Sequence, residues 1–188
     1  PHGGPVDRDG AGVVGDLAGF VAATFLRGVA FVQLPTTLLA QIDAAIGGKT
    51  AIDIAAGKNL VGAFHHPELV VADSAVLSTL SRAQLRNGLV EAIKMAALLD
   101  PDLLARIERD LEPLLAGDAT ALAPVVRGAA AAKVGVVERD PFEDGERQRL
   151  KDILKELANR ALHHRGVPGH VVALADRHRL FAPVNCEG

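Results

Sequence analysis

Apolar positions recur with a helical period near the start of the chain and then gather into short runs. Leu17, Val21 and Phe25 lie on one stripe, so residues 16–27 are predicted to form a helix that ends at Gly28. The apolar run at residues 30–34 stops at a proline and is typical of a buried parallel strand. A second such strand is predicted at residues 69–72.

Polar and glycine-rich segments separate these runs. Thr36 and Thr37 are placed to cap a helix that runs towards Asp43. Residues 47–50 (GGKT) and 57–59 (GKN) are centred on glycine and are predicted to be loops on either side of a brief apolar stretch.

From Ser81 onward the pattern predicts one helix after another. Ser81 can cap a helix that runs to about residue 99, and Asp100 followed by Pro101 is a strong start signal for the next. Gly117 and Asp118 precede an alanine-rich helix that ends near residue 139. A charged turn at 141–145 and an exposed helix at 146–164 follow. The predicted fold class is therefore α/β, with an α/β unit at residues 1–80 followed by an α-helical unit at residues 81–188.

Composition narrows the function classes. With 188 residues, 49% of them hydrophobic and 23% charged, the chain has the composition of a soluble globular protein. The net charge of −3 gives no electrostatic footprint for nucleic acid or an anionic membrane. A lone cysteine, Cys186, forms no intrachain disulfide, which suits the cytoplasm. Residues 1–10 show no signal-peptide pattern and are interpreted as a polar loop or as the start of a chain truncated upstream.

The first candidate for chemistry is a glycine pattern before the first helix. Residues 10–16 (GAGVVGD) match G-x-G-x-x-G, so backbone N–H groups and the helix dipole are suited to a pyrophosphate. The pattern fits an ordinary turn before a helix equally well, because no acidic residue stands about 20 positions further on.

A second candidate combines one acidic residue with two lysines. Residues 47–50 end like a P-loop, but Asp43 stands where that motif needs glycine, which disfavours a P-loop NTPase. Asp43, Lys49 and Lys58 are together suited to a phosphate or carboxylate ligand. The alternative is a pair of solvated surface lysines.

The third candidate is a pair of charged residues on one helix face. Glu91 and Lys94 are three positions apart and form either a surface ion pair or a metal-binding carboxylate beside a cation that orients substrate. The histidines show no metal-ligand spacing and are expected to face solvent.

Taken in order, these segments resemble the 3-dehydroquinate synthases, a family of sugar-phosphate cyclases, over residues 10–150. The segments that carry the resemblance are 12–20 (GVVGDLAGF), 25–29 (FLRGV), 35–41 (PTTLLAQ), 47–52 (GGKTAI), 57–64 (GKNLVGAF) and 91–94 (EAIK). The resemblance implies a partial NAD-binding domain at residues 1–80 and a metal- and substrate-binding domain at residues 81–188 that departs from the family after residue 150.

The resemblance also implies roles for individual residues. The catalytic set would be Asp43, Lys49, Lys58, Lys94, Lys133, Arg147 and Arg27, with Arg27 reaching the neighbouring subunit of a homodimer. The cofactor-binding set would be Gly12, Gly15, Asp16, Thr36, Thr37, Lys49, Lys58, Asn59 and Thr79. Glu91 would bind the metal, zinc or cobalt.

The implied reaction converts 3-deoxy-D-arabino-heptulosonate 7-phosphate to 3-dehydroquinate and phosphate, a step of the shikimate pathway to the aromatic amino acids. NAD would remove and return a hydride, and the metal would polarise the oxidised hydroxyl. Lysines and arginines would orient the phosphate and the carboxylate.

Two features depart from the family. A preceding nucleotide-binding half is absent before Pro1, and residues 151–154 (KDIL) replace the segment that carries a metal histidine in the family. We therefore expect a truncated or rearranged chain that lacks activity. The alternatives are another sugar-phosphate cyclase, of the 2-epi-5-epi-valiolone or 2-deoxy-scyllo-inosose synthase type, a more distant glycerol-dehydrogenase-like oxidoreductase, and a non-catalytic nucleotide-binding remnant.

Overall fold

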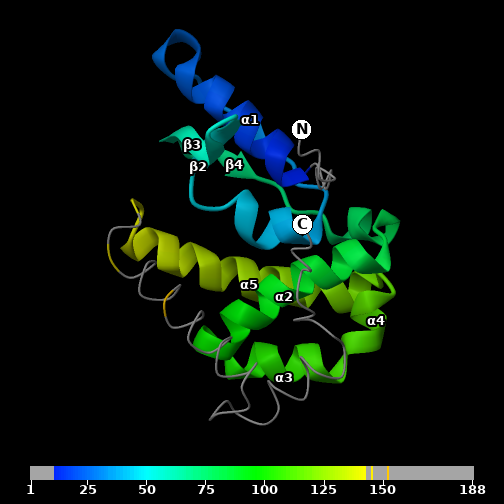
Figure 1. Ribbon diagram of the computed structural model, residues 1–188. Helices are drawn as coiled ribbons and strands as arrows, with labels where there is room; N and C mark the ends of the chain where they lie inside the picture. Colours follow the sequence, from blue (N-terminus) through cyan, green and yellow to red (C-terminus); the bar gives the residue numbers. More distant parts are fainter. Residues whose placement is uncertain (1–10, 143–144, 146–151, 153–188) are drawn as a thin grey trace. The chain divides into compact units, whose positions relative to one another are not determined.

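The structure, a computed structural model, describes residues 11–142 together with Gly145 and Asp152 (Figure 1). The chain divides into two compact units, Pro1–Phe142 and Glu143–Gly188. The first unit contains nearly all of the described residues. The loop predicted at residues 1–10 and the helix predicted at 146–164 lie outside the described residues.

Helix α1 (Ala11–Thr24) continues into the short 3-10 turn η1 (Phe25–Arg27). The predicted helix is confirmed, but it begins earlier, so that Gly12 and Gly15 lie within its first turns rather than in a preceding loop. Its packed side carries the small residues Gly19 and Ala22, whereas Leu17 and Val21 are about half exposed. The predicted apolar stripe therefore faces away from the packed side.

Strands β1 (Val32–Gln33) and β4 (Leu69–Val70) pair in parallel, with Val32 opposite Leu69. The two predicted parallel strands are confirmed, although both are shorter than expected. The burial predicted for the first strand is wrong, because Val32 is 51% exposed; Leu69 of the second strand is 55% exposed. The physical reason is that this sheet has only two strands among the described residues, so little covers its faces.

Strands β2 (Lys49–Ile54) and β3 (Gly57–Phe64) form an antiparallel hairpin where loops were predicted. Helix α1 packs on β2. The glycines that suggested loops serve the ends of the strands: Gly47 and Gly48 have positive φ just before β2, and Gly57 begins β3 at the turn. The side chain of Asp53 strengthens the turn by accepting a hydrogen bond from the backbone N–H of Asn59 at 2.9 Å.

Two short helical segments follow the parallel strands. The π-helical turn η2 (Ala40–Ala44) is capped as predicted, because the Thr37 hydroxyl accepts a hydrogen bond from the N–H of Ala40 at 3.2 Å. The 3-10 helix η3 (Ser74–Thr79) is capped by Asp73, whose carboxylate accepts from the N–H of Ala75.

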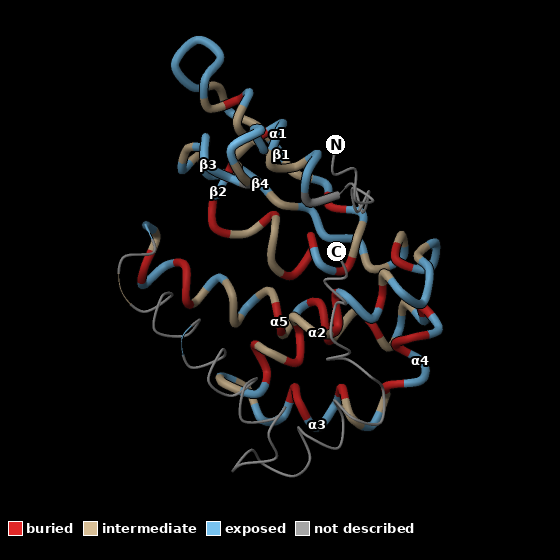
Figure 2. Tube along the Cα trace, in the orientation of Figure 1, coloured by how far each residue is buried: buried red, intermediate tan, exposed pale blue. Residues whose placement is uncertain are grey.

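The remaining described residues form the predicted helical unit, which comprises α2 (Arg82–Leu99), α3 (Pro101–Arg109), α4 (Leu111–Leu115) and α5 (Ala119–Arg139) (Figure 1). Ser81 begins α2 with a capping box, and Asp100 and Asp118 cap α3 and α5. Buried positions recur along α2, α3, α4 and α5 (Figure 2), and the largest are Leu85, Leu89, Ile107, Leu114, Leu122 and Val125.

Helix α5 is long and apolar enough to cross a membrane by length and composition alone. Leu122, Val125 and Ala129 of this helix are buried against the neighbouring helices, so α5 has the character of a core helix.

Candidate active site

The short helix η2 packs against α1, α2 and α5, and it brings Asp43 to the junction of the α/β part and the helical part. Asp43 forms an ion pair with Lys133 of α5, with 2.5 Å between the carboxylate oxygen and Nζ. The Lys133 side chain is 17% exposed and that of Asp43 is 32% exposed. A partly buried pair of this kind holds a cation in a fixed position at the junction.

Helix α2 contributes the second charged pair to this region. Glu91 and Lys94 form an ion pair on one face of the helix. Because the Glu91 side chain is only 16% exposed, the pair is mostly withdrawn from solvent rather than lying free on the surface. Helix α2 also packs against η2, the helix that carries Asp43, and the roles of Glu91 and Lys94 stay predictions.

A third acidic residue, Asp16 of α1, completes the charged junction. Burial of its carboxyl group, with smaller contributions from the negative charges of Asp53 and Asp43, raises the pKa of Asp16 to about 6. A carboxyl group with this pKa can hold or release a proton near neutral pH. Three elements, α1, η2 and β2, thus place carboxylates close enough to influence one another.

The hairpin positions the remaining basic candidates. Lys49 begins β2 with an exposed side chain, and Lys58 lies in β3, with its side chain outside the described part. Both residues therefore lie on strands and not in loops. Asn59 follows Lys58 with a positive φ of 55° and an exposed side chain. Asparagine tolerates this left-handed conformation better than most residues, and Asn59 lies in β3 opposite the register irregularity between Ile52 and Ile54.

The candidates for nucleotide contacts lie on α1, before η2 and at the end of η3. Gly15 sits against the side chain of Gln33 on β1, where an added Cβ would come within 3.1 Å of the Gln33 side-chain oxygen, so a small residue lets α1 approach the strand. Thr36 is exposed, Thr37 caps η2, and the Thr79 hydroxyl donates to the carbonyl of Val76. The N-terminal turns of α1 with Gly12 and Gly15, together with exposed Thr36, are chemically suited to the phosphate and hydroxyl groups of NAD.

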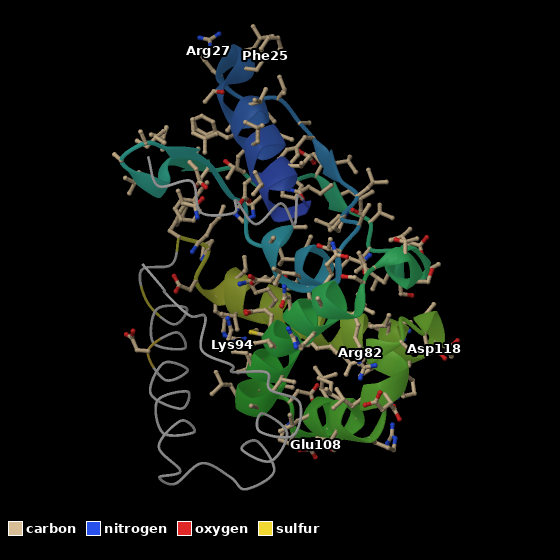
Figure 3. All side chains as sticks on the ribbon, turned by 45° about the vertical axis from the view of Figure 1, so that its right-hand side comes forward. Phe25, Arg27, Arg82, Lys94, Glu108 and Asp118 are labelled. Carbon is tan, nitrogen blue, oxygen red and sulfur yellow. The ribbon has the colours of Figure 1, made fainter. Side chains whose placement is uncertain are left out.

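Arg27 lies apart from the other candidates. It occupies the far tip of α1 beside Phe25, away from Lys94 on α2 (Figure 3). Leu26 and Arg27 both have positive φ, of 48° and 69°, which is a strained conformation for side chains of this size. Within the described unit Arg27 points outward and is exposed.

A divalent metal does not fit the described residues. No group of three or more histidine, cysteine, aspartate or glutamate side chains among residues 11–142 is arranged to hold a metal ion. Glu91 is the one predicted ligand among them, whereas a catalytic zinc site needs three ligands from the protein. Arg147, His163, His164, His170 and His178 lie outside the described residues.

Three polar residues with structural contacts were not among the predicted site residues. Asp53 closes the hairpin and raises the pKa of Asp16. Gln41 is buried in η2. His65, expected to face solvent, is half-buried, because its ring stacks on Phe31 and its Nε2 lies 2.9 Å from the carbonyl oxygen of Val29. The sequence signal that could have identified Gln41 is its position as a polar residue inside a capped, otherwise apolar segment.

Comparison with known proteins connects this geometry to one family. Residues 7–87 match the sequence model of the 3-dehydroquinate synthase N-terminal domain, and residues 88–151 match that of the C-terminal domain. The chain is 50% identical over 141 residues to the 3-dehydroquinate synthase of Geobacter metallireducens, covering 75% of this chain and 39% of that enzyme. For the enzyme of Xanthomonas axonopodis pv. citri the identity is 53% over 141 residues, covering 75% and 38%.

A third relative extends the match. The 3-dehydroquinate synthase of Pelotomaculum thermopropionicum is 44% identical over 172 residues, 92% of this chain and 43% of that enzyme, which exceeds the range of 10–150 predicted from the motifs. The chain thus spans about two fifths of the length of these relatives.

Solved structures agree with the sequence matches. The 2-epi-5-epi-valiolone synthase of Streptomyces hygroscopicus subsp. jinggangensis, which has NAD+ and Zn2+ bound, is 32% identical with a TM-score of 0.68, over 72% of this chain and 38% of that one. A 2-deoxy-scyllo-inosose synthase with NAD+ and Co2+ bound is 27% identical with a TM-score of 0.68, over 90% and 49%. NAD and a divalent metal, the predicted cofactors, are the groups bound in these two neighbours. The chain belongs to the 3-dehydroquinate synthase family.

Proposed function

We propose that the chain carries the NAD- and substrate-binding core of a 3-dehydroquinate synthase. The reaction is the conversion of 3-deoxy-D-arabino-heptulosonate 7-phosphate to 3-dehydroquinate and phosphate, a phosphate-eliminating lyase step that belongs to the shikimate pathway. The observation that carries the proposal is the presence of two partly buried ion pairs, Asp43–Lys133 and Glu91–Lys94, on elements that pack against one another (η2, α5 and α2) in a chain of this family.

The residues of the junction would bind and orient the substrate. Asp43 holds the ammonium group of Lys133 in place before any ligand arrives, so little side-chain freedom is lost when the lysine turns to a substrate carboxylate or phosphate. Lys94 is held by Glu91 in the same way. Lys49 and Lys58 would approach the phosphate from the hairpin, and Arg147 would join them.

The nucleotide would lie along the first turns of α1. Gly12 and Gly15 lie in these turns near the helix N-terminus, whose partial positive charge favours an anion such as a phosphate. Thr36, Thr37, Asn59 and Thr79 would contribute hydrogen bonds, with Lys49 and Lys58 near the phosphates. NAD, when bound, supplies reversible hydride transfer, and Asp16 can move a proton near neutral pH. Among the described residues, Glu91 is the single candidate for a metal ligand.

Arg27 fits a role between subunits. Its exposed position at the tip of α1 suits contact with a second copy of the chain, which would make the active protein a homodimer in the cytoplasm. A domain division near residue 80, with NAD held mainly before it and substrate mainly after it, belongs to the same proposal.

Calorimetry on the full chain tests the binding part of this proposal. We expect NAD to bind, and 3-deoxy-D-arabino-heptulosonate 7-phosphate to bind in its presence. Lys133→Met should weaken substrate binding by about tenfold or more, since it removes a charge-assisted contact. Arg82→Met is the matched control, because Arg82 pairs with Glu112 on the surface, away from the junction. Failure of the wild-type chain to bind either compound would contradict the proposal and favour a non-binding remnant.

Phosphate release and zinc content test the catalytic part. Because residues 151–154 (KDIL) stand where the family carries a metal histidine, we expect no turnover and no stoichiometric zinc in the chain. Robust phosphate release would show that the chain is a complete catalyst and would overturn the expected inactivity.

A second candidate function is another sugar-phosphate cyclase, favoured by the likeness to the valiolone and inosose synthases. Lys133 in a fixed ion pair suits a substrate that carries a carboxylate. Tighter binding of a sugar phosphate without a carboxylate than of 3-deoxy-D-arabino-heptulosonate 7-phosphate would favour this alternative.

A further inference from the structure

Gln41 has the most unusual polar environment of the first unit. Its residue is 1% exposed, and its side-chain nitrogen donates to two backbone carbonyls, those of Pro35 at 3.1 Å and Asp73 at 2.8 Å. These two acceptors define the orientation of the amide, because the reverse orientation would place three oxygens together. Gln41 therefore acts as a double donor.

The two carbonyls belong to equivalent places in the parallel sheet. Pro35 lies just beyond the end of β1, and Asp73 lies just beyond the end of β4. The backbone ladder between the strands ends with the hydrogen bond from the N–H of Val71 to the carbonyl of Gln33. Gln41 thus continues the connection between the strands at their carboxyl ends, the edge at which open α/β sheets bind ligands.

We define the clamp as the Gln41 side chain with the Pro35 and Asp73 carbonyls. Residues proposed to contact ligand lie on each side of it in the chain. Thr36 directly follows Pro35. The carbonyl of Thr37 accepts the backbone N–H of Gln41 at 3.0 Å. Asp43 lies two residues further along η2 and holds Lys133. A shift of the Gln41 side chain would therefore move both the threonine segment and the acidic end of η2.

The clamp leaves one hydrogen-bond acceptor unsatisfied. The Gln41 side-chain oxygen is buried and has no hydrogen-bond partner among the described residues. A buried acceptor without a partner costs free energy, so stability alone would favour a different residue at this position. A buried group that lowers stability in this way is expected at positions where function determines which residue is present.

We propose that Gln41 is a positioning residue for the nucleotide and substrate site: its amide fixes the spacing between the ends of β1 and β4 and thereby the placement of Thr36, Thr37 and Asp43. The inference rests on the proposed function, since it takes those three residues to be ligand contacts.

Two substitutions remove the clamp in different ways. Gln41→Met keeps the length of the side chain and removes both donated hydrogen bonds. Gln41→Glu keeps the shape, but an ionised carboxylate only accepts hydrogen bonds and would face two carbonyl oxygens. Ile42→Val is the matched control, because Ile42 is fully buried in the same turn and makes no side-chain hydrogen bond.

The first measurement is the dissociation constant for NAD on the 188-residue chain and its variants, at a temperature where all of them are folded by circular dichroism. We expect Gln41→Met to raise it about tenfold or more, Gln41→Glu to raise it further, and Ile42→Val to leave it within about twofold of wild type. Wild-type affinity in folded Gln41→Met would overturn the proposal, because a residue that contributes stability alone would give that result.

Amide hydrogen exchange separates failure of this inference from failure of the proposed function. If the wild-type chain binds no NAD, the proposed function fails and the clamp is judged by exchange alone. Faster exchange at residues 36–37 and 73–75 in Gln41→Met than in Ile42→Val, beyond the change elsewhere in the chain, would support the clamp. Equal exchange in the two variants would overturn it.

If both Gln41 variants fail to fold, Gln41→Asn is measured in the same way against Ile42→Val. Asparagine keeps the amide donor on a shorter side chain.

Discussion

At the scale of single residues, the charged junction works against the stability of the fold. Asp16 keeps a half-buried carboxyl group near two other carboxylates, and the pKa of Asp16 rises to about 6 as a result. In the unfolded chain this group would titrate near 3.8. Between these values the folded protein binds more protons than the unfolded chain, so the free energy of unfolding falls as pH rises through this window.

We predict that Asp16→Asn stabilises the protein above pH 6 and has little effect below pH 4. At neutral pH the gain should be about 1 kcal/mol, after discounting for solvent screening at a half-buried site. Urea unfolding between pH 4 and pH 8 measures it. Asp102→Asn, at an exposed position of α3, serves as the control and should leave the pH profile unchanged. Equal stability of wild type and Asp16→Asn at pH 8 would contradict the pKa of Asp16.

Sequence patterns could predict local residue pairs but not distant ones. Glu91 and Lys94 are three positions apart on a helix, so their contact follows from helical geometry. Asp43 and Lys133 lie far apart in the sequence, and only the packing of η2 on α5 brings them together. The contribution of Asp53 to the pKa of Asp16 depends likewise on α1 packing over β2. The roles of these residues in binding remain predictions.

At the scale of elements, chemical signals at the ends of helices were more informative than apolar runs. Ser81, Asp100 and Asp118 cap the helices that the sequence predicted, because a cap depends on a hydrogen bond within a few residues. The hairpin β2–β3 was missed because its glycines suggested loops. A strand pairs with a partner that local sequence does not show, so its extent is set by tertiary context.

The contact between α1 and β2 requires a glycine. A Cβ added at Gly19 would lie 2.5 Å from the Thr50 side chain, and Thr50 is itself buried. We predict that Gly19→Ala lowers the free energy of unfolding by about 1–3 kcal/mol through overpacking, although alanine is the better helix former. Thermal unfolding followed by circular dichroism measures the change.

Gly135→Ala in α5 is the matched control for that change. An added Cβ there would meet only the flexible end of Arg139, at 3.5 Å. Helix propensity alone should then raise the free energy of unfolding by about 0.5–1 kcal/mol. Stabilisation by both substitutions would show that α1 does not approach β2 as closely as the structure indicates.

At the scale of the whole molecule, apolar surface remains exposed on one part of the described unit. Helix α1 is apolar on more than one side, a property of helices that are covered on several sides. Its exposed stripe, formed by Val14, Leu17, Val21 and Phe25, is joined by exposed Val32 and Leu69 on the two-stranded parallel sheet. The helical group shows fewer large exposed side chains. Among the described residues, the exposed apolar surface is therefore concentrated on the α/β part.

The exposed stripe predicts strong binding of an apolar dye. We expect the folded chain to enhance the fluorescence of 8-anilinonaphthalene-1-sulfonate, and the double substitution Leu17→Lys, Val21→Lys to reduce that enhancement by at least half. Because both side chains are about half exposed, the free energy of unfolding should change by less than about 1 kcal/mol. Ala105→Lys, at an exposed position of α3, adds a lysine away from the stripe and should leave the fluorescence unchanged. The double variant could instead unfold, with no selective loss of dye binding. That result would mean that the stripe is buried in solution, because α1 is then covered by residues outside the described part of the chain or by another molecule.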